Sequence, residues 1–176
     1  MLLLADGEIL STISFTIVPG RVLKSKHKEV ILISRIQSMP GWPANKLRLA
    51  QRALHHLRFG AVLLSAVEGL AIAFNIRGIM CVDAEKQVSY TEDYADRFKH
   101  AYDYLFADMR VERTDAGYFS LELPLTEKEI EEGKSHKARA RARQALKKKI
   151  SLVCSKSVAA VMAGYLAEGV SVRYNS

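Results

Sequence analysis

The segment 134–149 holds the densest group of chemically informative residues in the chain, namely closely spaced cations. Arg139, Arg143 and Lys147 recur every four residues, which places them on one face if the segment is helical. Cations in such a row neutralise phosphate groups, whether these belong to nucleic acid or to anionic lipid headgroups. This ridge therefore predicts an anionic partner, and the simpler alternative is a helix face whose charges lie in water.

The apolar residues in and after the same segment predict how the helix packs. An apolar stripe that can pack on a core is formed by Ala138, Ala142, Leu146, Ile150 and Val153. The run Ser157–Ala167 extends it as a surface-seeking helix, which favours peripheral contact with an anionic membrane. No aromatic residue interrupts the ridge, so stacking on single-stranded nucleic acid has no support there.

A second possible chemistry is general acid–base catalysis at His55. The pair His55-His56 falls at the end of a predicted helix, where successive side chains point about 100° apart and cannot both face one site. An imidazole near Tyr102 and Asp103 would act as a general base, because histidine ordinarily titrates near pH ~6.5. Alternatively, the two histidines only interact favourably with the helix dipole. The chain has no Gly-x-Ser-x-Gly nucleophile signature.

A third candidate is a phosphate-binding loop between Arg35 and Lys46. Such loops bind phosphates with backbone N–H groups, but Pro40 and Pro43 lack this donor and only Gly41 supplies a glycine. The two basic residues that bound the segment could still bind phosphates through their charge. The missing donors favour the alternative, a solvated basic loop.

The composition is that of a folded basic protein. Of the 176 residues, 49% are hydrophobic and 26% charged, and the formal net charge is +7. This charge favours an anionic small molecule or an anionic surface as partner, with nucleic acid a further alternative. Cys81 and Cys154 have no second ligand at metal spacing, so no metal site is predicted. No apolar run reaches the roughly 18 residues of a membrane span, and we expect a cytoplasmic protein.

The elements that would position these residues follow from hydrophobic periodicity. Alternating patterns and buried apolar runs predict strands over 9–18, 30–33, 76–82, 109–111 and 118–123. Helical spacing predicts helices from Pro43 to the Phe59-Gly60 stop and over 61–74 and 92–105. A capping box at Thr126 and Glu129 opens a long charged helix. This order predicts an α+β fold, with a single mixed β-sheet and helices packed on it.

Several short motifs resemble, in the same order, those of the VirK/YbjX-like bacterial family. The segments that carry the resemblance are Leu10–Phe15, Arg35-Ile36-Gln37, Leu54-His55-His56-Leu57-Arg58, Tyr102–Phe106 and Ile130–Arg139. The chain departs from the family pattern at His56 and Phe59, where the family has glycine and proline. It also lacks the tryptophan that follows the family's Tyr-Asp pair.

This resemblance implies a VirK/YbjX-like domain over residues 1–149 and a C-terminal extension over 150–176. It also implies an N-terminus shorter than is usual in the family. Members are linked to virulence and to survival against cationic antimicrobial peptides. The order of elements is also similar in topology to the GNAT acyltransferases, which implies acyl-CoA as a ligand.

Two functional hypotheses follow from these resemblances and from the charge pattern. In the first, the chain is an acyl-CoA-dependent acyltransferase with catalytic His55, Tyr102 and Asp103 and with cofactor contacts from Arg35, Gln37 and Arg58. In the second, it is a non-enzymatic module that binds anionic lipid or nucleic acid through Arg139, Arg143 and Lys147. The salt dependence of binding distinguishes the two hypotheses, because binding to a charged surface weakens more steeply with ionic strength than binding in a pocket.

Overall fold

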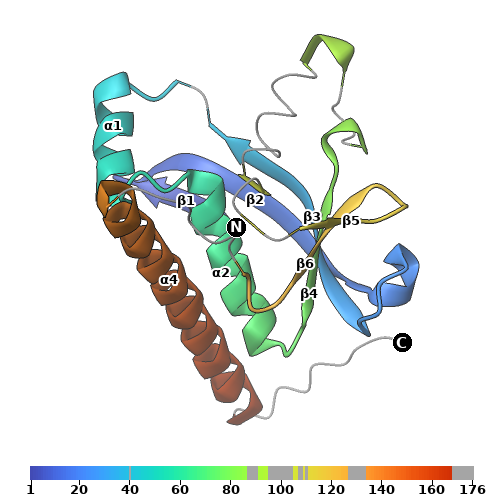
Figure 1. Ribbon diagram of the computed structural model, residues 1–176. Helices are drawn as coiled ribbons and strands as arrows, with labels where there is room; N and C mark the ends of the chain where they lie inside the picture. The colour runs from blue at the N-terminus through green and yellow to red at the C-terminus, as the bar shows by residue number, and fades with distance from the viewer. Residues whose placement is uncertain are drawn as a thin grey trace.

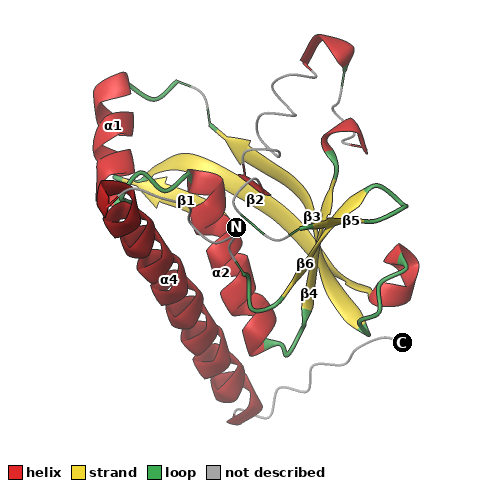
Figure 2. Ribbon diagram, viewed as in Figure 1, coloured by secondary structure: helices red, strands yellow, loops and turns green. Residues whose placement is uncertain are grey.

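A single mixed β-sheet organises the computed structural model, which describes residues 1–39, 41–86, 91–94, 105–106, 109, 111–126 and 134–167. Its strands are β1 (Leu2–Ala5), β2 (Glu8–Pro19), β3 (Glu29–Ser38), β4 (Gly78–Val82), β5 (Glu112–Arg113) and β6 (Tyr118–Glu122). They lie in the order β1-β2-β3-β4-β6-β5. Strands β3 and β4 are parallel and all other neighbours are antiparallel (Figure 2). The predicted α+β class is confirmed.

The helices form two layers on one face of this sheet. Helix α1 (Ala44–Ala53) and helix α2 (Phe59–Ala73) connect β3 to β4, and α4 (Lys134–Ala167) follows β6. Figure 1 shows α2 lying between the sheet and α4. Because α2 packs on both neighbours, apolar residues are needed nearly all round it, which explains its sequence. Short 3-10 turns occur at η1 (Gly20–Leu23), η2 (Ala84–Lys86) and η3 (Glu92–Tyr94).

The main core lies between α2 and the sheet. Fully buried strand residues such as Ile13, Ile31 and Ile79 pack there against Leu64 and Val67 of α2. A smaller cluster on the opposite face of the sheet joins Val30 and Met80 to η1. Since strand residues point alternately to the two faces, β3 and β4 supply apolar side chains to both clusters.

A β-bulge in β3 reverses which residues face α2. Ser14 pairs with Arg35 while Phe15 pairs with Ile33, so Ser34 is an extra residue. After the bulge Ile36 lies on the α2 side, where its side chain packs against the core. The neighbouring Arg35 therefore lies on the opposite face of the sheet, and it is exposed.

Most predicted elements form where the sequence pattern placed them. Strands β2, β3, β4 and β6 and helix α2 match the predicted segments to within a few residues, although β3 extends further, to Ser38. Helix α1 ends at Ala53, earlier than expected, and β1 was not predicted at all. The strand predicted at 109–111 does not overlap the observed strand β5, which begins at Glu112. The predicted helix over 92–105 lies largely outside the described residues, as does most of the capping box.

The two helical layers meet at an unusually close backbone contact. A Cβ atom placed on Gly69 of α2 would lie 2.2 Å from the Ser151 carbonyl oxygen and 2.8 Å from the Cys154 Cβ atom of α4. Only glycine permits this approach, because any side chain would overlap backbone of the facing helix. Gly69 and Ser151 are accordingly buried.

We predict that Gly69→Ala lowers the free energy of unfolding by about 1–3 kcal/mol, because α4 must move to admit the methyl group. Chemical denaturation followed by circular dichroism measures this change. Gly164→Ala is the matched control, since nothing lies within 4 Å of its added Cβ atom. The free energy of unfolding of that variant should rise by up to about 1 kcal/mol, because alanine has a higher helix propensity than glycine. Equal stability of Gly69→Ala and the wild type would show that the two helices are not locked at this point.

Candidate anionic-surface site on helix α4

Helix α4 has two opposite faces that differ in what they contact. We call Lys147, Ser151, Cys154 and Val158 the inner face; they are spaced as one side of a helix and are all buried or half-buried. We call Lys149, Leu152, Val153 and Lys156 the outer face; they have the same kind of spacing and are all exposed. Leu152 and Val153 expose 55% and 54% of their surface. The outer face therefore presents two lysines and two large apolar side chains to solvent.

The charge of the chain is concentrated in this helix. Helix α4 contains nine lysines and arginines and no aspartate or glutamate. The remaining residues carry 17 lysines and arginines against 19 acidic residues, out of 26 and 19 in the whole chain. Helix α4 thus accounts for all of the net positive charge, and the rest of the chain is slightly negative.

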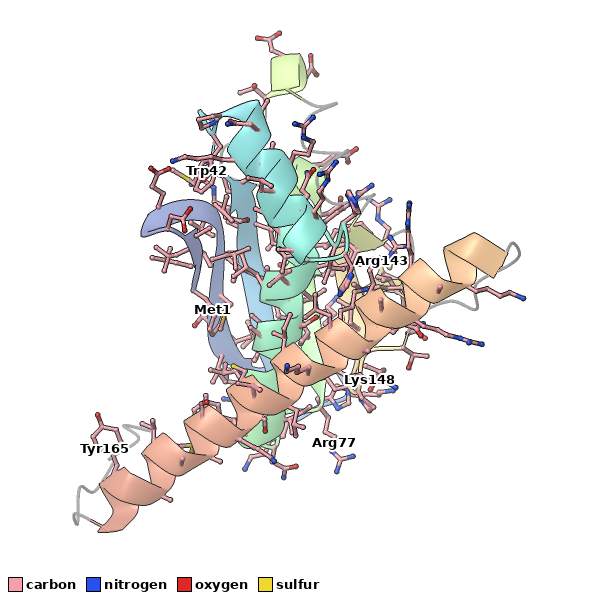
Figure 3. All side chains as sticks on the ribbon, turned by 90° about the vertical axis from the view of Figure 1, so that its left-hand side faces the viewer. Met1, Trp42, Arg77, Arg143, Lys148 and Tyr165 are labelled. Carbon is pink, nitrogen blue, oxygen red and sulfur yellow. The ribbon has the colours of Figure 1, made fainter. Side chains whose placement is uncertain are left out.

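The end of α4 extends beyond the helix that supports it. Figure 3 shows the segment with Tyr165 projecting past α2. Val161 and Tyr165 expose 58% and 54% of their surface there. Two large apolar side chains that lie exposed one turn apart make this end of α4 a candidate contact surface.

The predicted ridge and stripe are only partly placed as expected. Arg139 is exposed, but Arg143 and Lys147 are half-buried because this side of α4 turns toward the protein. Leu146 and Ile150 pack on the core, whereas Ala138 and Val153 are exposed, so the predicted stripe is wrong at both ends. The contact with Gly69 sets the rotation of the helix: it selects the small side chains of Ser151 and Cys154 for the interface.

A buried carboxylate lies at the edge of the inner face. Glu68 of α2 is 8% exposed and accepts a hydrogen bond of 2.8 Å from the Leu125 N–H. Burial raises the pKa of Glu68, while hydrogen bonds from Leu125 and Ser151 and the charge of Lys147 act in the opposite direction. Glu68, Leu125 and Lys147 line a cavity of about 340 Å³ beside α4. Lys147 thus lies beside a buried carboxylate and its charge acts on that group, which the sequence pattern did not indicate.

Among the described residues, those implied for an acyl-CoA site are not brought together. Arg58 lines an apolar cavity of about 440 Å³ between α1 and the start of α2, and neither Arg35 nor Gln37 is among the lining residues. The bulge explains this separation, because it turns Arg35 and Gln37 away from the α2 side. His55 is exposed and does not line the cavity either. Tyr102 and Asp103 lie outside the described residues.

A metal site, a membrane-spanning helix and a reactive thiol at Cys81 find no support among the described residues. In that part of the chain, no group of three or more histidine, cysteine, aspartate or glutamate side chains is arranged to hold a metal ion. No helix there is both long and apolar enough to span a bilayer. Cys81 is buried in the core and burial raises the pKa of its thiol, so it is not a poised nucleophile.

Comparison with known proteins identifies the family. The family described as "Protein of unknown function (DUF535)" matches residues 1–154. The chain belongs to this family. DUF535 is the VirK/YbjX family, so that resemblance is confirmed. No curated protein and no solved structure matches the chain, and the resemblance to GNAT acyltransferases stays a hypothesis. The match ends within α4, which continues unbroken across residue 150.

One departure from the VirK/YbjX pattern has a direct structural consequence. His55 and His56 have φ angles of 51° and 60°, in the left-handed region that disfavours residues with a Cβ atom. These angles end α1 before the two histidines, so neither is a helical residue. The family's glycine at position 56 suits this conformation, whereas histidine is strained in it.

We predict that His56→Gly raises the free energy of unfolding by about 1 kcal/mol by relieving this strain. The matched control is Ala53→Gly at the last residue of α1, three residues earlier, which should lower the free energy of unfolding by up to about 1 kcal/mol. Thermal unfolding of both variants checks that His56→Gly is more stable, and Ala53→Gly less stable, than the wild type. A destabilised His56→Gly variant would contradict the left-handed turn.

We also predict a pH-dependent difference between the wild type and Glu68→Gln. A carboxyl whose pKa is raised by folding stabilises the folded state fully below its unfolded pKa, and that contribution is lost as pH rises through the folded pKa. The ordinary pKa is 4.5, so the wild type should lose stability relative to Glu68→Gln as pH rises from about 4 to 7. Urea unfolding across this range measures the difference, and a constant difference would contradict the assigned burial.

Proposed function

We propose that this DUF535 protein binds the surface of anionic lipid bilayers through the outer face of α4. The observation that carries the proposal is the combination of Lys149 and Lys156 with exposed Leu152 and Val153 on one side of a helix that has no acidic residue. Interfacial helices combine these two features: cations attract anionic headgroups while apolar side chains enter the boundary of the acyl region.

The distribution of charge supports an oriented encounter. Since α4 carries all of the net positive charge and the remainder of the chain is slightly negative, an anionic surface attracts α4 in preference to the rest of the molecule. Each lysine near such a surface contributes about 1 kcal/mol at physiological salt. The projecting Tyr165 supports the same orientation, because tyrosine is favoured at the boundary between headgroups and acyl chains.

Nucleic acid is the less favoured partner for the same helix. Phosphate contacts require cations, and they gain nothing from the exposed leucine and valine between the lysines. A lipid surface uses both kinds of side chain. Membrane binding also suits the family link to cationic antimicrobial peptides, since a protein that covers anionic headgroups competes with such peptides for the same sites.

Acyl-CoA-dependent acyl transfer is the other hypothesis that the sequence raised. It requires His55 near a bound thioester, and His55 lies outside the cavity that contains Arg58. Transfer assays with a panel of acyl-CoA donors test this hypothesis directly. Acyl transfer that disappears in His55→Ala would establish it and displace the membrane proposal as the primary function.

We predict that Lys149→Glu/Lys156→Glu binds vesicles containing phosphatidylglycerol at least twentyfold more weakly, at about fivefold for each lysine. Co-sedimentation with these vesicles, and with neutral phosphatidylcholine vesicles, measures the partition. Raising the salt concentration should weaken vesicle binding of the wild type. The binding that persists at high salt should be lost in Leu152→Ser/Val153→Ser, because it depends on the apolar side chains.

The matched control is Arg35→Glu, which makes the same change of charge as the single variant Lys149→Glu but on the exposed face of the sheet away from α4. Lys149→Glu alone should weaken vesicle binding about fivefold. Arg35→Glu should bind vesicles much as the wild type does. Equal loss in Arg35→Glu would mean that net charge rather than the outer face matters, and would overturn the proposal. Binding to duplex DNA without binding to anionic vesicles would replace it with a nucleic-acid function.

A further inference from the structure

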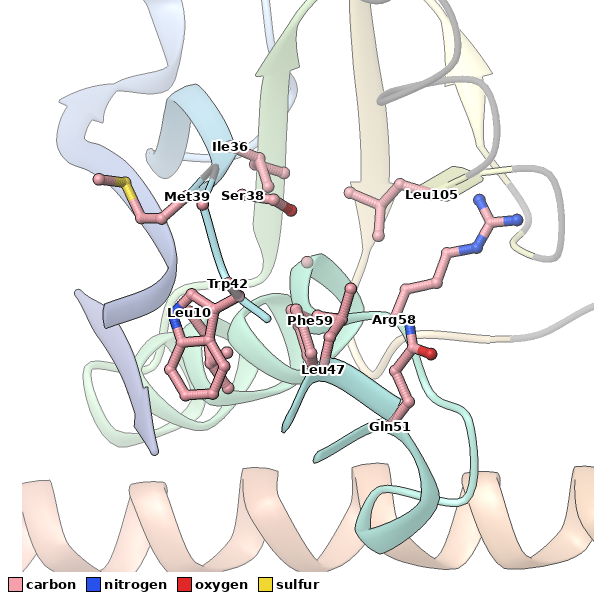
Figure 4. Close-up of a pocket in the computed structure, with 12 residues that line it drawn as sticks. Leu10, Ile36, Ser38, Met39, Trp42, Leu47, Gln51, Arg58, Phe59 and Leu105 are labelled. Carbon is pink, nitrogen blue, oxygen red and sulfur yellow. The ribbon is translucent and has the colours of Figure 1, made fainter. Parts of the chain in front are cut away.

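The cavity beside α1 is shaped and lined differently from the charged surface of α4. It has a volume of about 440 Å³, within the range of small-molecule sites. Its wall is mainly apolar, with Leu10, Trp42, Leu47, Phe59 and Leu105 among the lining residues. Figure 4 shows Trp42 and Leu10 on one side, Leu47 and Phe59 in the middle, and Arg58 on the side away from Trp42.

Helix α1 covers this cavity without being packed into the core. None of its residues is buried, although Leu47 and Ala50, with Leu54 directly after the helix, form a half-buried apolar side. Buried apolar faces normally hold such a helix in place, and here the cavity occupies part of the space that side chains would fill. An apolar ligand in the cavity would therefore complete the packing of α1.

The charge at the cavity fixes the kind of head group that such a ligand carries. Among the described lining residues Arg58 is the one ionisable side chain, and it is exposed at the rim. Gln51, also exposed, lies beside Arg58 (Figure 4) and adds an amide donor. A guanidinium pairs well with carboxylate and phosphate groups. An elongated ligand would thus place its anionic head at the rim and its aliphatic tail toward Trp42.

We propose that this cavity binds a single-chain amphiphile with an anionic head, such as a fatty carboxylate or a monoacyl phospholipid. Its tail lies between Leu47, Phe59 and Trp42, and Arg58 holds its head. This site goes beyond the proposed membrane function and does not depend on it, because it uses no residue of α4.

The experiment follows the fluorescence of Trp42, which is the single tryptophan of the chain. Its indole N–H donates a hydrogen bond of 3.2 Å to the Ile9 carbonyl oxygen, so the ring has a defined starting environment. Titration with octanoate, decanoate and dodecanoate, each below its micelle concentration, should give saturable changes. Affinity should rise about three- to fourfold for each added methylene until the cavity is filled.

Variants separate the contribution of the head from that of the tail. Arg58→Gln should weaken dodecanoate binding at least tenfold and leave binding of uncharged dodecanol unchanged. Arg35→Gln is the matched control and should bind as the wild type does, because Arg35 does not line the cavity. Leu47→Phe narrows the tail site and should shorten the longest chain that binds well. The Lys149→Glu/Lys156→Glu variant should bind dodecanoate normally, which keeps this test distinct from the vesicle test.

Two comparisons complete the design. Comparing the affinity for monoacyl phosphatidylglycerol with the affinity for dodecanoate shows whether the rim prefers a phosphate or a carboxylate head group. Hydrogen exchange with saturating dodecanoate should show slower exchange of α1 amides, since the ligand completes the packing of that helix. The proposal is overturned if the Trp42 signal does not saturate, if affinity is independent of chain length, or if Arg58→Gln and the wild type bind dodecanoate equally.

Discussion

The near-contact of two helix backbones at Gly69 determines how the outer layer of this protein is arranged. A helix packs in the rotation about its own axis that best fits the surface of its neighbour. Here the neighbouring surface of α2 has Gly69 at the point of closest approach. The small residues Ser151 and Cys154 must then point inward. Once they do, the rotation is fixed, and Lys149, Leu152, Val153 and Lys156 point to solvent because helical geometry leaves them no other direction.

The interface formed in this way is not an ordinary apolar one. It combines backbone proximity with the buried carboxylate of Glu68, which the Leu125 N–H and the charge of Lys147 partly compensate. A buried charge of this kind contributes little net stability but penalises alternative rotations that would leave it unpaired. Small residues and one carboxylate therefore specify the orientation of α4 together with Leu146 and Ile150, which pack on the core, while Leu152 and Val153 remain exposed on its other side.

Local patterns in the sequence were sufficient for much of the sheet. The alternation of β2 and the continuous apolar run of α2 each have one physical explanation, a half-buried strand and a helix covered on two sides. The rotation of α4 was not predictable in this way. Its helical spacing allows several faces, and the choice depends on Gly69, about 80 residues earlier in the chain. The separation of Arg35 from Arg58 likewise depends on one extra residue in β3 that no sequence pattern marks.

The length of α4 has a geometric consequence for the whole molecule. Its 34 residues correspond to a rod roughly 51 Å long, more than twice the length of the 15-residue α2 beneath it. A rod lying flat on a planar surface fixes both the tilt and the height of everything attached to its inner side. Packed layers are roughly 10 Å apart, so α2 would act as a spacer that holds the sheet about 20 Å above the plane. The strands, and the rim at Arg58, would then face water at a set distance from the lipid rather than lying within it.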